Sequence, residues 1–544
     1  RTGGIPSRNV LSFTEPDHVW LLHQGLSGAL FECLSRQVGA VGLWALRLSL
    51  LLATWVCTYA ASRALRVSRY WACGFTLLAV HASSFRFELR PYLFTHLALA
   101  CVMWALALRA VGRAELRAEL AIFAAISCGF QWHAGALDSV IVTGMFALGT
   151  VLDDVRSGRP AYRQACLFAL AAVGGVLAAA ALLSVYHPLG ARVLSVPFQM
   201  ATHGYWGEHL VEFRHAWKLP LRLLWPYWLW LTLVAWAVVT QARRLPTGLI
   251  LCALTYAALS LWFVRMVYAF AIISAPLVAL AAEYRGQQVR SPFGLRPALP
   301  LALLCALTIT HGLSGQQLGL GSAEWVWPRA QFAFVRSHQL QGQAFVSDAW
   351  AGSFLGEFYP ERRAFFDNRI EAYSDHLARV VYQNIRYGAA GWDKQLDHYG
   401  IEFLLLRYTT PGEAEFARTS SADGATLRQR LVNDPRYALV YFDDVGELFV
   451  RTTGLNATLA RTHAIRGVDP DRHTFLGPPA RAAAALLRAA SSGMQSETAL
   501  GLTALALADA GDLEHARALS ATLRERSPDG AFTRAVLTRL EHMH

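Results

Sequence analysis

The stretch Phe345–Arg369, FVSDAWAGSFLGEFYPERRAFFDNR, follows the last long apolar segment of the chain and is rich in reactive residue types. Two short apolar runs in it, Phe345-Val346 and Ala364–Phe366, lead to Asp348 and Asp367, and glycines and a proline lie between them. Apolar runs bounded by turn residues are typical of strands. The stretch therefore predicts the first strands of a soluble domain, with two carboxylates near a sheet edge.

The same stretch places an acid, an amide and a guanidinium side by side at Asp367-Asn368-Arg369. Two interpretations are open. The polar groups could hold a ligand at the sheet edge. Alternatively, this is a turn after a strand, in which Asp accepts hydrogen bonds from backbone N–H groups and Arg pairs with a neighbour.

Composition indicates a membrane protein with a soluble part, because 54% of the 544 residues are hydrophobic and 16% are charged. The formal net charge is +11, but the basic residues form small clusters between apolar segments, which argues against nucleic acid as a partner. All eight cysteines lie in or beside apolar segments, so the sequence predicts no disulfide framework.

Apolar segments at ten places predict an α-helical polytopic membrane protein, although several are shorter than the roughly 20 residues of a straight span. They are Val41–Ser62, Trp71–Ser84, Tyr92–Arg109, Glu119–Trp132, Ala136–Leu152, Ala165–Val185, Leu223–Thr240, Thr247–Leu261, Met266–Ala282 and Ala298–His311. Arginines cluster in alternate loops between them, and the positive-inside rule makes those loops cytoplasmic. The N-terminal segment and everything after Gly312 then share the outer side.

The sequence divides into four predicted regions. Residues 1–37 form a first outer loop with a surface helix, in which Trp20, Leu21, Leu26, Leu30 and Leu34 recur at helical spacing. Residues 38–313 form the transmembrane core. Residues 314–467 form an α/β domain, with further strands at Phe403–Leu406, Ala438–Phe442 and Leu448–Val450. After a linker at Pro478-Pro479, residues 478–544 form a helical tail.

Polar residues of the predicted outer loops are the candidates for a site. Glu15, Asp17 and His23 flank Trp20 and could bind a metal or act as acid and base, or Asp17 could simply start the surface helix. Arg86, Glu88 and Arg90 alternate before Pro91 and could hold a phosphate or form an ion network. His133, Asp138 and Arg265 lie at outer membrane boundaries, where a polar core residue or a snorkelling arginine is the alternative.

Motifs on the predicted outer side occur in a consistent order. They are IPSRNVLSFTEPDHVWLLHQ at Ile5–Gln24, RPYLF at Arg90–Phe94, WHAG at Trp132–Gly135, HPLG at His187–Gly190, VRMVYAFAIISAP at Val264–Pro276, and then SDAWAGSFL, YPERRAFFDNR, GWDKQLDHYGIEFLLL and YALVYFDDVGELFVR. With them the chain resembles bacterial multispanning proteins of the GT-C glycosyltransferase architecture, distantly similar to the oligosaccharyltransferase catalytic subunit and to mannosyltransferases that use lipid-linked sugars.

The resemblance implies an inverting enzyme of the bacterial inner membrane with a periplasmic α/β domain, which moves a sugar from a polyprenyl-phosphate donor to an acceptor. It implies Glu15 and Asp17 as the catalytic base or as metal ligands, and it leaves open whether Mg²⁺ or Mn²⁺ binds at Asp17 and His23. The donor phosphate is assigned to Arg90, Arg265 and His133, and acceptor positioning to Asp348, Trp350, Asp367 and Arg369. In related proteins the principal acid precedes the match to Ile5-Pro6, so we expect it upstream of Arg1, where the chain starts without Met.

The tail segment LALADAGDLEHARALSATLRERSPD, Leu505–Asp529, resembles one tetratricopeptide unit and implies docking on the α/β domain or on a protein partner; a plain helical hairpin is the alternative. Two rival functions remain open as well. One is a non-catalytic scaffold or assembly subunit of a membrane complex. The other is a transporter, which needs a site near the membrane midplane.

Overall fold

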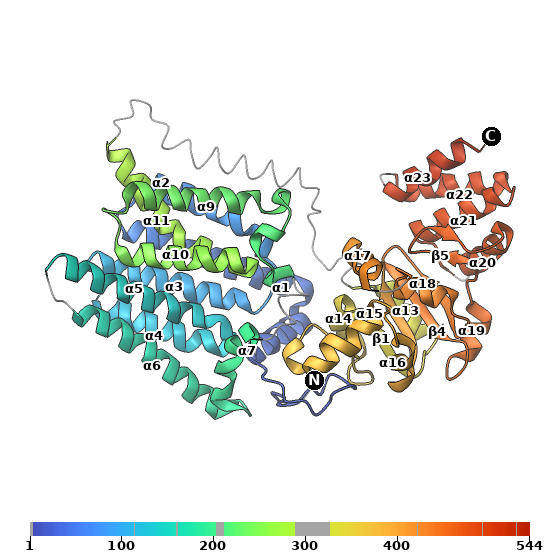
Figure 1. Ribbon diagram of the computed structural model, residues 1–544, viewed down its shortest axis with the longest axis horizontal. Helices are drawn as coiled ribbons and strands as arrows, with labels where there is room; N and C mark the ends of the chain where they lie inside the picture. Colours follow the sequence, from blue (N-terminus) through green and yellow to red (C-terminus); the bar gives the residue numbers. More distant parts are fainter. Residues whose placement is uncertain are drawn as a thin grey trace. The chain divides into compact units, whose positions relative to one another are not determined.

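The computed structural model describes residues 4–113, 115–158, 162–202, 211–288, 327–420, 423–491, 493–528 and 530–543. These residues form two compact units (Figure 1). The helical unit contains residues 4–7 and 21–288, and the sheet unit contains residues 8–20 and 327–543.

The helical unit is a bundle of long helices joined by short connections (Figure 1). Its helices are α1 (Gly25–Ala64), α2 (Arg69–Ser83), α3 (Tyr92–Ala110), α4 (Glu115–Trp132), α5 (Leu137–Arg156), α6 (Tyr162–Tyr186), α7 (Val196–Thr202), α9 (Leu221–Gln241), α10 (Thr247–Trp262) and α11 (Val267–Gln288). Short 3₁₀ turns, η2 (Ala134–Ala136) and η6 (Val264–Met266), lead into α5 and α11.

Six of the described helices are long and apolar enough to cross a membrane, so the protein is a polytopic helical membrane protein. They comprise Gly39–Ala64, Tyr92–Ala110, Ala134–Arg156, Tyr162–Tyr186, Leu221–Gln241 and Val264–Gln287. The other predicted segments in the described ranges are helical: α2 has 15 residues, about 22 Å at 1.5 Å per residue, and α10 has 16. Helix α4 has 18 residues but carries Glu115, Arg117 and Glu119 near its start. The ten predicted spans are thus not shown, and Ala298–His311 lies outside the described residues.

The predicted surface helix differs from the observed structure. Helix α1 begins only at Gly25, and both Trp20 and Leu21 precede it as buried residues of the chain leading in. Gly39 has a φ of 69° inside α1, in the left-handed region that a residue without Cβ adopts without strain. Helix α1 is therefore kinked at Gly39, which separates its first turns from the membrane span that follows.

Helix α11 forms the centre of the helical unit. Its residues from Val267 to Ala282 are buried almost without exception, because α1, α2, α3, α9 and α10 surround it. Elsewhere, small residues allow close helix approach. A Cβ atom added to Gly149 of α5 would lie 2.2 Å from the Cα atom of Gly248 in α10, so this crossing requires glycine.

The sheet unit contains a four-stranded sheet in the order β1-β2-β4-β3. Strands β1 (Gln343–Val346) and β2 (Ile401–Arg407) are parallel, whereas β4 (Gly446–Arg451) runs antiparallel to β2 and to β3 (Tyr437–Phe442). Its helices are α13 (Arg329–Ser337), α14 (Asp348–Phe358), α15 (Gln383–Arg386), α16 (Trp392–His398), α17 (Pro411–Ser420), α18 (Leu427–Asn433) and α19 (Ala457–His463), with a π-helical turn at Leu377–Tyr382. The predicted α/β domain and its β3–β4 hairpin are present.

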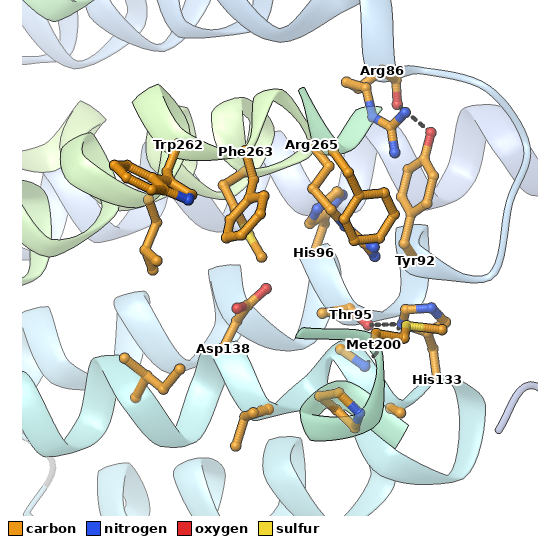
Figure 2. A pocket seen from close by; sticks show the side chains of 18 of the residues that line it. Arg86, Tyr92, Thr95, His96, His133, Asp138, Met200, Trp262, Phe263 and Arg265 are labelled. Carbon is orange, nitrogen blue, oxygen red and sulfur yellow. Dashed lines mark hydrogen bonds between the residues drawn. The ribbon is translucent and has the colours of Figure 1, made fainter. Parts of the chain in front are cut away.

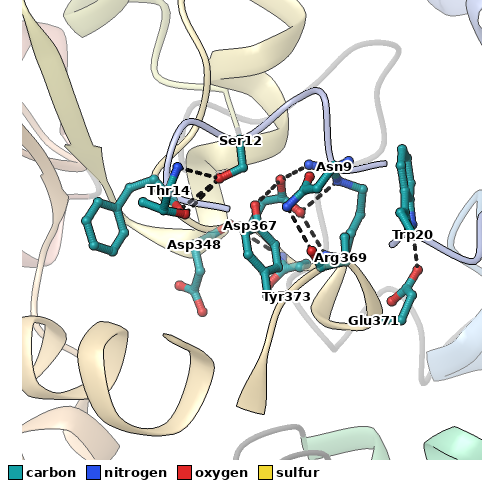
Figure 3. Close-up of polar contacts among 12 residues, drawn as sticks. Asn9, Ser12, Thr14, Trp20, Asp348, Asp367, Arg369, Glu371 and Tyr373 are labelled. Carbon is teal, nitrogen blue, oxygen red and sulfur yellow. Dashed lines mark hydrogen bonds and ion pairs between the residues drawn. The ribbon is translucent and has the colours of Figure 1, made fainter. Parts of the chain in front are cut away.

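The predicted strand at Ala364–Phe366 does not join this sheet. Its backbone pairs instead with residues 8–20, which we call the strap (Figure 3). The Ala364 N–H donates to the Leu11 carbonyl at 2.9 Å, and the Phe13 N–H donates to the Ala364 carbonyl at 3.2 Å. The predicted outer loop 1–37 is thus divided, because the strap packs with the domain that follows the membrane helices.

The strap also fixes the topology. It precedes the first membrane span, and residues 327–543 follow the last described one, yet the two fold into a single unit. A folded unit lies on one side of a membrane, because an unpaired backbone within the bilayer is too costly. By this argument the strap and residues 327–543 share one side of the membrane, which agrees with the sequence analysis; which side that is stays a prediction.

The tail forms α20 (Pro479–Ser491), α21 (Glu497–Asp509), α22 (Leu513–Arg526) and α23 (Ala531–Glu541). Pro479 begins α20, where its missing N–H is tolerated, so Pro478-Pro479 is a helix start and not a free linker. Asp444 in the β3–β4 turn accepts hydrogen bonds from the backbone N–H groups of Glu497 and Thr498, at 3.2 and 2.7 Å. The tail is therefore attached to the α/β domain.

Candidate functional site

A cavity of about 570 Å³ lies in the helical unit where α3, α5 and α11 begin and α10 ends, which we call the open end (Figure 2). The chain reverses direction here through η2 and η6, so polar side chains from several connections meet. The polar lining includes His23, Arg86, Thr95, His96, His133, Asp138, His215, Lys218 and Arg265. The cavity thus joins residues that the sequence had placed at outer boundaries of separate segments.

Arg265 is the most unusual of these residues. It lies in η6, where the Val264 N–H donates to the Arg214 carbonyl at 3.1 Å, and its guanidinium stands 4.5 Å from the ring centroid of Phe213. Within the described ranges, the Arg265 guanidinium forms no direct ion pair, although the carboxylates of Glu212 and Asp138 are near enough to interact with it electrostatically. A guanidinium with five donors that faces a cavity in this way is suited to an anionic ligand.

Arg86, in contrast, is paired within the protein. Its Nη1 lies 2.8 Å from a carboxylate oxygen of Glu212, and Arg90 lies 3.5 Å from the same oxygen. Burial would raise the pKa of Glu212, but the charges of Arg86, Arg265 and Arg90 outweigh it and hold that pKa below its ordinary value. The alternating arginines before Pro91 therefore form an ion network, whose acid lies far along the chain.

Arg90, predicted to hold the donor phosphate, does not line the cavity. Its side chain is 51% exposed and also pairs with Glu88 at 3.0 Å. Alternation of charges in the sequence could not distinguish Arg86 from Arg90, because the arrangement depends on Glu212, more than 100 residues away.

His133 is held at the start of η2. The Gly135 N–H donates to its Nδ1 atom at 3.0 Å, and Thr95 Oγ1 lies 3.1 Å from the same atom. Because Nδ1 accepts a hydrogen bond, the proton of a neutral ring is on Nε2, which makes His133 a donor there. His23 lies beside it, with ring centroids 5.1 Å apart, and burial lowers the pKa of His23 to about 4, so this ring is neutral at pH 7.

Asp138 is the carboxylate among the described lining residues. It lies in the first turn of α5, where a negative charge suits the helix dipole, and its Oδ1 atom accepts a hydrogen bond from the Tyr256 hydroxyl at 2.9 Å. No described residue donates to its second carboxylate oxygen. The sequence marked Asp138 as an uncommon group in a membrane segment but gave it no role.

The predicted acids of the first loop belong to the sheet unit. Glu15 and Asp17 belong to the strap, whereas His23 belongs to the helical unit. The Glu15 carboxylate accepts hydrogen bonds from the backbone N–H of Ser374, at 2.7 Å, and from its hydroxyl. Asp17 is 84% exposed and pairs with Arg8. In the part of the chain that the structure describes, no group of three or more His, Cys, Asp or Glu residues could hold a metal ion.

The four residues predicted to position an acceptor are held inside the sheet unit. Trp350 is fully buried in its core, and Asp348 pairs with Arg386 at 2.9 Å. Asp367, 3% exposed, accepts from Arg369 Nε at 2.8 Å and from the Arg369 N–H at 2.8 Å (Figure 3). The structure thus shows the second interpretation of Asp367-Asn368-Arg369, a turn with a local ion pair.

Arg369 also joins the strap to the domain. Its guanidinium lies 4.4 Å from the ring centroid of Trp20, whose indole N–H donates to Glu371 at 3.5 Å (Figure 3). Burial raises the pKa of Glu371 to about 7. Through these contacts the polar residues of this cluster hold the strap against the rest of the sheet unit.

Comparison of the chain with known proteins gives no relative from which a function could be transferred. No protein-family model matches the sequence, and no curated protein matches it either. The geometry of the cavity is therefore the basis for a functional assignment.

Proposed function

We propose that the protein is a GT-C-type glycosyltransferase that moves a sugar from a polyprenyl-phosphate donor to an acceptor hydroxyl at the open end of the helical unit. The observation that carries the proposal is Arg265, a guanidinium that faces the cavity and forms no direct ion pair with a described residue, although Glu212 and Asp138 interact with it electrostatically. A partly buried cation without a counter-charge in direct contact is unfavourable, and an anionic ligand that binds it directly would reduce that penalty.

The rest of the cavity wall favours an anion that carries an apolar chain. Leu259 of α10, Phe263 and Met266 of η6 line the same cavity as Arg265. A phosphate ester binds Arg through paired hydrogen bonds, while its lipid tail requires an apolar surface. A polyprenyl phosphate satisfies both requirements.

Asp138 supplies the base in this proposal. One carboxylate oxygen of Asp138 is held in place by the hydrogen bond from Tyr256. The other carboxylate oxygen accepts the proton of the acceptor hydroxyl while the hydroxyl oxygen attacks the anomeric carbon of the sugar. The bond from the anomeric carbon to the phosphate oxygen breaks, and its electron pair leaves with the polyprenyl phosphate. Arg265 stabilises the added negative charge, and a single displacement inverts the anomeric centre.

The distribution of basic residues supports an orientation. Arg63, Arg66, Arg109, Arg113 and Arg156 lie near the ends of α1, α3 and α5, at the opposite end of the helical unit from the cavity. By the positive-inside rule that end is cytoplasmic. The proposal therefore places the protein in a bacterial inner membrane, with the cavity and the sheet unit on the periplasmic side and the tail available to a protein partner.

The test is mass spectrometry of lipids that co-purify with the full-length protein in mild detergent. We expect a polyprenyl phosphate or its sugar conjugate in the wild-type protein and in Arg192→Ala, which removes an exposed arginine outside the cavity lining. Arg265→Ala should lose this lipid without a change in thermal unfolding.

Retention of the lipid by Arg265→Ala, or its absence from the wild-type protein, contradicts the assignment. A stoichiometric protein partner together with no bound lipid supports the non-catalytic scaffold instead.

A further inference from the structure

Aromatic rings gather where α10 ends at the cavity. Trp262 is the last residue of α10, lines the cavity and is 56% exposed. His215 lines the same cavity, and its ring lies edge to face with Trp262 at a centroid distance of 4.9 Å. Trp217 stacks on His215 at 4.5 Å and lies 6.1 Å from Trp262. Three flat side chains thus support one another beside the proposed phosphate site.

We infer that Trp262 and His215 form the subsite for the sugar ring of the donor, an inference that rests on the proposed function. Trp262 precedes Arg265 by three residues, on the same connection from α10 through η6. The sugar of a polyprenyl phosphosugar is bonded directly to the phosphate. A phosphate at Arg265 therefore leaves the sugar in the space that adjoins Trp262, which Asp138 also lines.

The chemistry of these residues suits a pyranose ring. A pyranose presents C–H groups on a ring face and hydroxyl groups around its rim. The negative π face of an indole attracts the weakly positive C–H groups and contributes a large dispersion surface. His215 Nδ1 lies 2.9 Å from the Trp262 carbonyl oxygen and must donate to it, so Nε2 of the neutral ring remains an acceptor for a sugar hydroxyl.

Tryptophans at a membrane interface also occur without a ligand, as anchors at the headgroup level. Trp225 of α9 fits that role: it is 44% exposed, lies edge to face with His81 at 5.3 Å, and does not line the cavity. Trp262 differs because it shares its cavity with Arg265 and Asp138. Trp225 is therefore the matched control for a tryptophan that only anchors the protein.

The experiment compares the affinities of the full-length protein in detergent for polyprenyl phosphate and for the same lipid carrying mannose, glucose, galactose or arabinose. We expect at least one sugar conjugate to bind about tenfold more tightly than the bare lipid. Trp262→Ala should reduce this ratio to about one while the affinity for bare lipid stays unchanged, which also shows that the variant is folded. Trp262→Phe should keep part of the ratio, and Trp225→Ala should keep all of it.

Equal affinity of wild-type protein for bare lipid and for all four conjugates overturns the sugar subsite, and so does an unchanged ratio in Trp262→Ala. Absence of binding to every lipid, the bare one included, contradicts the proposed function itself. The two failures are therefore distinguishable in one data set.

Discussion

At one end of the helical unit, charged groups are tied to partners within the protein; at the open end, Arg265 and Asp138 face a cavity. The first of these, which we call the closed end, holds Arg109 and Glu119 as a pair at 2.9 Å, each about one-tenth exposed. There, too, Glu283 accepts the Ser68 N–H at 2.9 Å, and Asp153 accepts the Thr247 N–H at 3.0 Å. Closed-end charges thus join neighbouring helices, whereas the open end leaves charges available to a ligand.

The presence or absence of a direct partner distinguishes charged residues that stabilise the fold from those that can bind a ligand, which residue type alone does not do. Arg109 and Arg265 both lie at helix ends next to apolar segments, yet among the described residues Arg109 forms a direct ion pair with an acid and Arg265 does not.

The closed end also argues against the transporter alternative. A transporter needs a site that can be reached from both sides of the membrane, whereas hydrogen bonds and an ion pair join the described helices at the closed end.

The largest effect should follow removal of the carboxylate at the open end. Asp138→Asn still accepts the Tyr256 hydrogen bond but cannot take a proton, so transfer should fall about 100- to 10,000-fold. Binding of polyprenyl phosphate should remain. A transfer assay with purified protein checks this, and a variant that retains more than a tenth of the activity would exclude Asp138 as the base.

Next comes the pair at the closed end. Glu119→Ala leaves the Arg109 guanidinium without its carboxylate, and we expect a loss of about 3 kcal/mol in the free energy of unfolding. The double variant Arg109→Met/Glu119→Leu should recover most of this loss, because neither charge remains. Thermal unfolding in detergent measures both variants. If Glu119→Ala lost lipid binding but kept its stability, the closed-end pair would serve ligand binding and not the fold. That result would contradict the distinction between the closed and the open end.

A partly buried acid in the sheet unit extends the comparison outside the membrane. Glu371 has a pKa of about 7 in the folded protein, against an ordinary value of 4.5, because burial favours its neutral form. Between these values the folded state binds more protons than the unfolded state. The free energy of unfolding should therefore fall as pH rises from about 4.5 to about 7, by about 3 kcal/mol in total, and change no further above that.

Glu371→Gln should lack this contribution. The measurement is the difference in unfolding free energy between variant and wild type across that pH range. A difference that stays constant with pH would show that burial does not raise this pKa.

The smallest expected effect concerns helix packing away from the open-end charges. Gly149→Ala places a methyl group against the backbone of Gly248 and should destabilise the α5–α10 crossing by about 1 to 3 kcal/mol. Gly144→Ala, also in α5, adds its methyl to a position with no atom within 4 Å and serves as the control. Equal unfolding temperatures for the two variants would mean that α5 and α10 can move apart at this crossing without a loss of stability.

Local patterns predicted the parts of the fold that depend on local physics. Apolar runs gave the helices, and Asp443–Gly446 between two apolar runs gave the β3–β4 hairpin. Helix length was less certain, because a 15-residue helix such as α2 and a complete span have the same composition. Ala364–Phe366 resembled a strand and does pair its backbone, but with the strap, which no local pattern indicates.

The candidate site was predicted in part. Arg265, His133 and His23 stood out as polar groups beside apolar segments, and all three line the cavity. The role predicted for Glu15 and Asp17 stays a prediction: Glu15 accepts a hydrogen bond from Ser374 in the sheet unit, whereas the carboxylate among the described lining residues of the cavity is Asp138. Pairings such as Arg86 with Glu212 depend on tertiary contacts between distant residues, and a single sequence does not contain them.

The strap has a consequence for how the protein is made. The Ser12 hydroxyl donates to the Phe365 carbonyl, a partner 353 residues later in the chain. At ribosomal rates of about 5 to 20 residues per second, the strap waits roughly 20 to 70 seconds for that partner. The sheet unit therefore cannot fold in the order of its synthesis. Its first segment remains without this partner until the helical unit and the chain as far as Phe365 have been synthesised.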